Sequence, residues 1–185
     1  MRIIGGSARG LHLTPVGVGD AQAHLRPTSD RVRESIFNLL INGGYGNPLQ
    51  NARVLDVFAG TGALGLEALS RGASSATFLE NGAAAAPLLK RNIALMRTED
   101  RCEILRRDAT KPGLNPGAAF EVIFLDPPYG KAMGELALTA LTLWIAPEAL
   151  VIWEESTKPV PPAGFEFLDQ RKYGDTLVTI LKAPA

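Results

Sequence analysis

The stretch "VIFLDPPYG" at residues 122–130 places an acid, two prolines and an aromatic ring directly after an apolar run. Proline fixes φ and has no N–H, so Pro127 and Pro128 form a stiff bend whose preceding carbonyls can point outward as acceptors. Together with such a carbonyl, the Asp126 carboxylate could accept both N–H groups of a flat, conjugated amine and so expose the nitrogen lone pair. Tyr129 could stack on the ring that carries this amine and hold it in line with an electrophile. The motif therefore predicts a planar amine as nucleophile, with Asp126 or a water beyond it taking the proton.

A second stretch, "DVFAGTGALG", contains Gly60, Gly62 and Gly65 in a G-x-G-x-x-G pattern between a predicted strand and a predicted helix. Glycines let the backbone turn tightly and approach a ligand closely. Glu80 ends the next predicted strand, where a carboxylate can accept hydrogen bonds from both hydroxyls of a ribose. The turn and the acid together predict a cofactor that contains a nucleoside. An Asp-Pro pair by itself is a common start of a turn with no further role. Because the glycine turn and Glu80 precede it in this sequence, we favour a functional site at Asp126–Tyr129.

NAD and S-adenosylmethionine both present a ribose to such an acid, and two features favour the second. Asp56 lies in the last turn of the strand before Gly60, where its carboxylate could receive an ammonium group that a methionine moiety has and NAD lacks. The chain also has no separate substrate domain of the kind that a small dehydrogenase needs. At the end of the third strand, Asp108 and the N–H of Ala109 could meet an adenine. A solvated loop acid or a helix cap explains Asp108 equally well.

The elements that must position these residues alternate between strand and helix from residue 53 onward. The spacing of apolar residues and the positions of glycine and proline predict strands at 53–59, 76–80, 102–108, 121–126 and 149–155, and helices at 63–72, 83–96 and 134–145. Gly174 and Asp175 join two further strands as a hairpin. The expected fold is a doubly wound α/β sheet of seven mostly parallel strands, covered by helices on both faces and closed by an antiparallel hairpin.

Residues 1–50 do not show this alternation of strands and helices and are expected to form a small N-terminal extension to a catalytic domain at 51–185. "MRIIGGSARGLHLTP" indicates short strands with glycine turns. "RPTSDRVRESIFNLL" indicates a helix capped by Ser29 or Asp30, with Val32, Ile36, Leu39 and Leu40 on its apolar side and Arg31 and Arg33 pointing elsewhere.

Composition adds mainly exclusions. The 185 residues carry a formal net charge of zero, so bulk charge gives no argument for a nucleic-acid partner. One cysteine, Cys102, makes neither a disulfide framework nor a metal cluster, and His12 and His24 have no metal-ligand spacing. The N-terminus lacks a signal-peptide pattern, and no apolar run is long enough to span a membrane. We expect a cytoplasmic monomer without a metal ion.

Four stretches carry a resemblance to a known family. "VLDVFAGTGALGLEALSRGA" followed by "LDPPY" resembles the S-adenosylmethionine-dependent N-methyltransferases of nucleic-acid bases. "RIIGGSARG" and "RPTSDRVRESIFNLL" narrow the resemblance to the bacterial small-subunit ribosomal RNA guanine-N2 methyltransferases. The resemblance extends from residue 2 to "YGDT" at 173–176. It implies a class I methyltransferase sheet.

The resemblance also implies the site residues, in three groups. The cofactor pocket would comprise Asp56, Phe58, Ala59, Gly60, Thr61, Gly62, Glu80, Asn81, Asp108 and Ala109, and the amino acceptor would meet Asp126, Pro127, Pro128 and Tyr129. The N-terminal extension is similar to the part that meets RNA in this family, through Arg2, Arg9, Arg26, Arg31 and Arg33. The sequence departs from the family's habit in "ENGAAAA", which has small residues where a charged one commonly follows the acid, and at Leu11 and His12, where a basic residue is usual.

The leading hypothesis is methyl transfer from S-adenosylmethionine to the exocyclic N2 of a guanine in small-subunit (16S) ribosomal RNA. The base should be presented unstacked, because its amino group must meet the methyl group in line. One alternative is an adenine-N6 methyltransferase that acts on DNA or RNA, since the proline pair does not separate two planar, conjugated amines. A second alternative, from another class, is an NAD-dependent oxidoreductase or a nucleotide-binding module.

Overall fold

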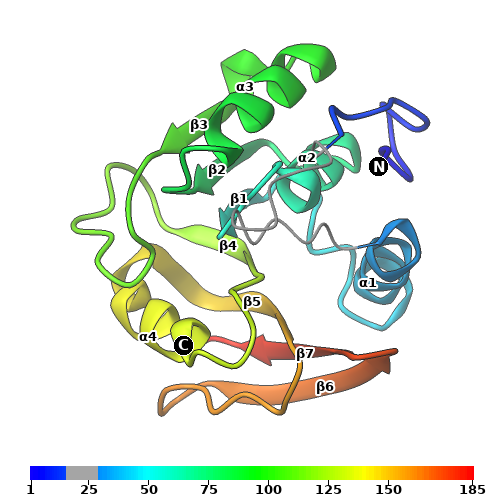
Figure 1. The fold of residues 1–185 in the computed structure, drawn as a ribbon. Coiled ribbons are helices and arrows are strands. Elements are labelled where there is room, and N and C mark those ends of the chain that lie inside the picture. The colour runs from blue at the N-terminus through cyan, green and yellow to red at the C-terminus, as the bar shows by residue number, and fades with distance from the viewer. Residues whose placement is uncertain (16–28) are drawn as a thin grey trace.

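The computed structural model describes residues 1–15 and 29–185, which fold around one seven-stranded sheet with the strand order β3-β2-β1-β4-β5-β7-β6 (Figure 1). Its first five strands are parallel, and β7 joins β5 and β6 antiparallel. The strands are β1 Arg53–Val57, β2 Ser75–Leu79, β3 Cys102–Leu105, β4 Phe120–Leu125, β5 Ile145–Glu155, β6 Glu166–Tyr173 and β7 Thr176–Lys182. The predicted fold class, including the closing hairpin, is confirmed.

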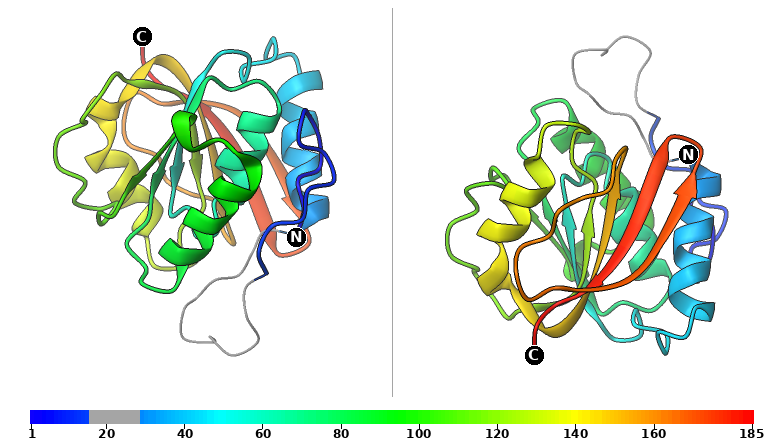
Figure 2. Two further views of the ribbon diagram at one scale, coloured as in Figure 1. Left: turned by 90° about the horizontal axis from the view of Figure 1, so that it is seen from above. Right: turned by 90° about the horizontal axis from the view of Figure 1, so that it is seen from below.

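Helices cover both faces of the sheet, as the two views along it show (Figure 2). They are α1 Asp30–Asn42, α2 Ala63–Ser70, α3 Ala85–Met96 and α4 Met133–Ala140, with short 3-10 turns at Glu99–Arg101 and Thr142–Trp144. The helix expected at 134–145 therefore ends early and continues as a 3-10 turn. Pro87 is the third residue of α3, inside the first turn, where its missing N–H breaks no intrahelical bond.

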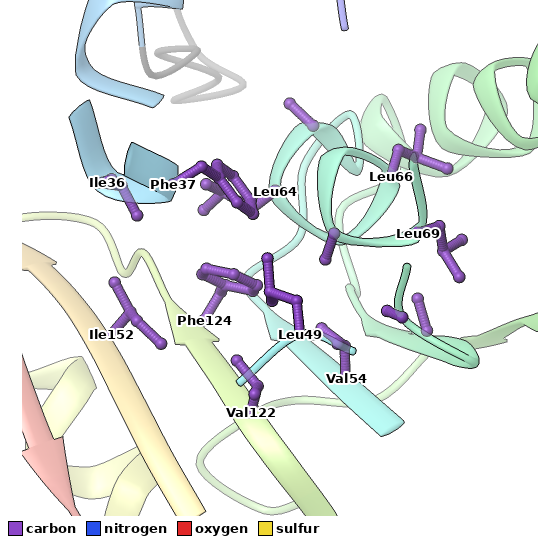
Figure 3. Packing of buried hydrophobic residues seen from close by; sticks show 14 of the residues in the cluster. Ile36, Phe37, Leu49, Val54, Leu64, Leu66, Leu69, Val122, Phe124 and Ile152 are labelled. Atoms are coloured by element: carbon purple, nitrogen blue, oxygen red, sulfur yellow. The ribbon is translucent and has the colours of Figure 1, made fainter. Parts of the chain in front are cut away.

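Two hydrophobic cores lie on opposite faces because side chains alternate along each strand. On β4, Val122 and Phe124 pack with helices α1, α2 and α3, whereas Ile123 and Leu125 pack with α4. Figure 3 shows the first core from close by, with Phe37 of α1 above Phe124. The centroids of these two rings lie 5.4 Å apart at a tilt of 43°. Both faces of the central strands are buried, which explains their continuous apolar runs.

The N-terminal extension shares the first core with the main sheet. Ile3 and Leu13 are buried in the same cluster as the strand residues, and the strands expected before residue 15 reduce to one bridge between Arg2 and His12. Helix α1 begins as predicted, with the Ser29 hydroxyl accepting a hydrogen bond from the backbone N of Val32 at 3.3 Å.

The prediction that Arg33 points away from the core is wrong. Its side chain is fully buried, and α1 turns Arg33, Ile36, Phe37 and Leu40 to the same side. The guanidinium donates from Nη2 to the carbonyl of Arg2 at 2.5 Å and to Asp30 Oδ1 at 2.9 Å. Burial lowers the pKa of Arg33, and the nearby acids oppose that shift. The apolar spacing placed the helix correctly, but it gave no sign that a charged residue lies within the buried stripe.

Candidate functional site

The glycine turn and the proline pair, far apart in the sequence, emerge at the same edge of the sheet. Strands β1 and β4 are parallel neighbours with Val57 opposite Leu125. The backbone N of Asp126 donates to the carbonyl of Val57 at 3.3 Å, directly before the glycine turn. In a sheet of this topology the crevice between these two strands is the place where ligands bind, because the chain leaves them toward opposite faces.

Glu80 brings a third loop to this edge. Its Oε2 accepts a hydrogen bond from the backbone N of Gly60 at 2.7 Å, and its Oε1 accepts one from Gly82 at 2.6 Å. The backbone N of Glu80 itself donates to Leu105, at the end of β3. Each carboxylate oxygen can accept more than one hydrogen bond, so these contacts orient the acid and leave acceptor capacity for ribose hydroxyls.

Asp56 lies beneath the turn with its side chain buried. Its Oδ2 accepts a hydrogen bond from the backbone N of Gly65 at 2.8 Å, in the first turn of α2. Burial raises the pKa of Asp56 well above its ordinary value; the Gly65 bond opposes this, and the charges of Asp126 and Glu80 raise it further. Asp56 is therefore close enough to Asp126 and to Glu80 for each of these acids to disfavour its charged form.

The turn itself depends on left-handed backbone. Gly60 has φ 54° and Gly62 has φ 79°, a region that L side chains rarely adopt. Phe58, which is not glycine, also has a positive φ of 60°, and its N–H donates to the carbonyl of Leu79 at 3.0 Å. A Cβ on Gly65 would lie 2.5 Å from the Phe78 ring, so the third glycine allows helix and strand to pack closely.

At the proline pair, Pro127 is buried while Asp126, Pro128 and Tyr129 are partly exposed. The Tyr129 hydroxyl lies 3.3 Å from Thr176 Oγ1, at the start of β7. The backbone N of Gly130 donates to the carboxylate of Glu155 at 3.1 Å. The start of β7 and the end of β5 thus contact residues 126–130, the predicted acceptor loop. Sequence reasoning assigned no such contact to Thr176, although "YGDT" was part of the resemblance.

The residues predicted to meet adenine differ in exposure. Asp108 is exposed, and its Oδ1 accepts from both the backbone N and the hydroxyl of Thr110 at 2.8 Å, which lowers the pKa of Asp108. Ala109 is buried and Asn81 is exposed. The alternative interpretation of Asp108 was a solvated loop acid or a helix cap; Asp108 is exposed, lies outside the helices and bonds to Thr110 two residues on. A contact to adenine stays a prediction.

The residues predicted to contact RNA have different exposures. Arg2, Arg9 and Arg31 are exposed, and Arg2 Nε lies 3.6 Å from Asp30. Arg33 is buried, so an RNA contact is not assigned to it. Arg26 and His24 lie outside the described residues, and His12 is exposed.

Sequence reasoning missed the buried polar residues that hold the N-terminal segment on the main domain. The Glu67 carboxylate, on α2, accepts from the backbone N of Ile4 at 2.7 Å and of Gly5 at 2.8 Å. The Ser70 hydroxyl donates to the carbonyl of Gly5 at 2.6 Å and accepts from the backbone N of Ala8 at 2.9 Å. The only sequence signal was the position of two polar residues inside an otherwise apolar helix.

The residues at the edge of the sheet fit S-adenosylmethionine. Asp56 lies close to Glu80 and Asp126 beside a tight glycine turn, and a ligand that carries a sulfonium and an ammonium group would offset the cost of the charged form of Asp56. Among the described residues, no three or more His, Cys, Asp or Glu side chains are arranged so that they could hold a metal ion, and no helix is long and apolar enough to cross a membrane.

Comparison with known proteins places the chain in a family. The model of the family described as "Conserved hypothetical protein 95" matches residues 1–182. The chain belongs to this family. It is 35% identical to the "Ribosomal RNA small subunit methyltransferase D" of Escherichia coli, over 100% of this chain and 91% of that protein. The resemblance inferred from the motifs is thereby confirmed.

Solved structures share the fold of this chain. The structure described as "Putative methyltransferase yhhF" from Escherichia coli is 33% identical to this chain, and the match covers 100% of this chain and 98% of that one with a TM-score of 0.83. A distant structure, an O-methyltransferase family protein from Burkholderia thailandensis, has 12% identity and a TM-score of 0.61 over 84% of this chain and 60% of its own. This second likeness concerns the fold alone and is consistent with a class I methyltransferase sheet.

Proposed function

We propose that this family member transfers a methyl group from S-adenosylmethionine to the exocyclic N2 of a guanine in small-subunit ribosomal RNA. The observation that carries the proposal is the hydrogen bond from the backbone N of Asp126 to the carbonyl of Val57. It joins the predicted acceptor loop to the start of the glycine turn at residues 58–62, which is the proposed cofactor turn. The name of the Escherichia coli relative supports ribosomal RNA as the substrate class. Such a substrate would place the reaction in the cytoplasm.

The chain's own residues would perform four tasks. Glu80 and the glycine turn would hold the ribose, and Asp56 would provide negative charge for the amino-acid end of the cofactor. The Asp126 carboxylate would accept an N–H of the guanine amine, orient its lone pair, and take the proton directly or through water. Tyr129 would stack on the base. When bound, S-adenosylmethionine supplies an electrophilic methyl group on a sulfonium.

RNA would approach from the side of the N-terminal segment. Arg2, Arg9 and Arg31 are exposed there and can contact phosphates, which position an RNA without reading its sequence. Since the formal net charge of the whole chain is zero, the attraction must come from such local groups. Binding should therefore weaken steeply as the salt concentration rises.

The decisive experiment supplies labelled S-adenosylmethionine to small ribosomal subunits, and separately to deproteinised RNA, from a strain that lacks the enzyme, and then maps the modified nucleotide. The expected product is N2-methylguanine at one position. Label on the N6 of adenine would replace the guanine assignment with the adenine alternative. A wild-type protein that binds NAD but not S-adenosylmethionine would reject the proposal as a whole.

Asp126→Asn gives the matched test of the acceptor site. It keeps the shape of the side chain but removes the charge, so we expect kcat to fall about 10²- to 10³-fold, the usual cost of one well-placed electrostatic group. Binding of S-adenosylhomocysteine, measured by calorimetry, should survive. Asp100→Asn, at an exposed acid in the 3-10 turn before β3, is the control and should leave both quantities unchanged. Joint loss of binding and activity in Asp126→Asn would assign Asp126 a structural role.

A further inference from the structure

Asn92, a buried residue of α3, connects two segments that are far apart in the sequence. Its side chain is fully buried. Its Nδ2 donates to the carbonyl of Thr61, between the two left-handed glycines of the cofactor turn, at 2.9 Å. Its Oδ1 accepts from the backbone N of Thr14 at 2.8 Å. No motif in the sequence singles out this residue.

The chemistry of both partners fixes the orientation of the Asn92 amide. The carbonyl of Thr61 can only accept and the backbone N of Thr14 can only donate, so one group of the side chain must donate and the other must accept. Aspartate has nearly the same shape but no donor. Asn92→Asp would keep the Thr14 contact and turn a carboxylate oxygen toward the Thr61 carbonyl.

The N-terminal segment also contacts the cofactor turn at a second point. The Thr61 hydroxyl lies 3.8 Å from the sulfur of Met1. Residues of the same segment are bonded to Glu67 and Ser70 on α2, the helix that begins directly after Gly62. The segment that carries Arg2 and Arg9 thus contacts both the cofactor turn and helix α2, which follows that turn.

We propose that Asn92 is a positioning residue that sets the carbonyl of Thr61 and couples the N-terminal segment to the cofactor turn. The inference rests on the proposed function, because it takes the turn as the S-adenosylmethionine site and the segment as a contact for RNA. Because the planar Asn92 amide bonds to both Thr14 and Thr61, a shift of the N-terminal segment at Thr14 moves the amide and with it the carbonyl of Thr61. Binding at either place therefore alters affinity at the other, and by the same factor in both directions.

Asn92→Asp tests the positioning. We expect the Kd for S-adenosylhomocysteine to rise about tenfold, equivalent to about 1.4 kcal/mol, at a temperature where the variant is folded. The KM for S-adenosylmethionine should rise with it while kcat changes less, because Asn92 does not touch the reacting groups. Amide hydrogen exchange should accelerate in peptides covering 1–14 and 53–64 but not in the β6–β7 hairpin.

Asn115→Asp is the matched control. Asn115 holds a loop with the same pair of bonds, donating from Nδ2 to the carbonyl of Ala118 and accepting from the backbone N of Gly117, but in the exposed connection between β3 and β4. Its variant should bind S-adenosylhomocysteine as the wild type does. If Asn92→Asp does not fold, Asn92→Ser is used. The serine side chain is shorter and has one polar atom, which cannot occupy the positions of both Oδ1 and Nδ2, so it serves one partner and an intermediate Kd is expected.

The coupling between RNA binding and cofactor binding is measured separately. Small ribosomal subunits that lack the proposed N2-methylguanine should lower the Kd of the wild-type protein for S-adenosylhomocysteine, and this decrease should be smaller in Asn92→Asp. Equal Kd values and equal exchange rates in wild type and variant would overturn the inference while leaving the proposed function intact. If the wild type does not bind S-adenosylhomocysteine, the proposed function fails instead, and hydrogen exchange still decides whether Asn92 holds the turn.

Discussion

Glu67→Gln is expected to loosen the N-terminal segment from the main domain. The wild-type carboxylate is fully buried and accepts from the backbone N of Ile4, from the backbone N of Gly5, and from Arg71 Nε at 2.7 Å. Glutamine keeps one oxygen, which can still serve Gly5 and Arg71. Its NH₂ group then faces the N–H of Ile4, so that contact is lost and two donors oppose each other.

The magnitude follows from this count of hydrogen bonds. A bond to a charged group contributes about 1.5–3 kcal/mol, and a buried donor left unpaired costs a similar amount. We therefore expect a loss of about 3 kcal/mol, a sizeable part of the roughly 5–15 kcal/mol that stabilises a typical domain. This corresponds to about a hundredfold shift in the equilibrium between docked and released states of the segment.

Two assays distinguish local release from global unfolding. Urea titration followed by the fluorescence of buried Trp144 and Trp153 reports the cores, and limited trypsin digestion at Arg9 reports the segment. Release alone would speed cleavage at Arg9 and leave the urea midpoint almost unchanged, whereas coupled unfolding would move both. Glu103→Gln, at an exposed position on β3, is the control and should stay within about 0.5 kcal/mol of wild type. Identical behaviour of the two variants in both assays would refute the reasoning.

Three further changes probe the site. Asp56→Asn should stabilise the cofactor-free protein, because burial raises the pKa of Asp56 and the charged form is costly; the amide oxygen can still accept from Gly65. That gain should be small near pH 4 and grow as the pH rises toward about 7, which urea midpoints at both values would show, while affinity for S-adenosylmethionine falls. Gly62→Ala forces an L residue into left-handed backbone and brings its Cβ to 2.4 Å from Leu89, so a loss of about 1–2 kcal/mol is expected in thermal unfolding. Tyr129→Phe removes the hydroxyl but keeps the ring, so activity assays should show a modest fall in kcat compared with a large one for Tyr129→Ala.

Local sequence patterns were sufficient to predict where the candidate site would form. Glycine and proline mark the ends of strands β1 and β4, and alternating strands and helices imply parallel neighbours with right-handed crossovers. The carboxyl ends of such strands lie at one edge, so the turn at Gly60 and the acids Glu80 and Asp126 were expected together. The hydrogen bonds from Asp126 to Val57 and from Gly60 to Glu80 confirm that placement.

The same patterns could not predict which polar residues would be buried. Arg33 is predicted to point away from the core because charged residues are usually exposed, and no pattern in the sequence singles out Glu67 or Asn92. Their partners lie far away in the chain: 63 residues separate Glu67 from Ile4, and 78 separate Asn92 from Thr14. Composition and spacing describe near neighbours along the chain, whereas a buried polar group is stabilised only by the partners that folding brings to it. The sequence thus determined the fold and the position of the site, and the tertiary structure decided how the N-terminal segment is attached to it.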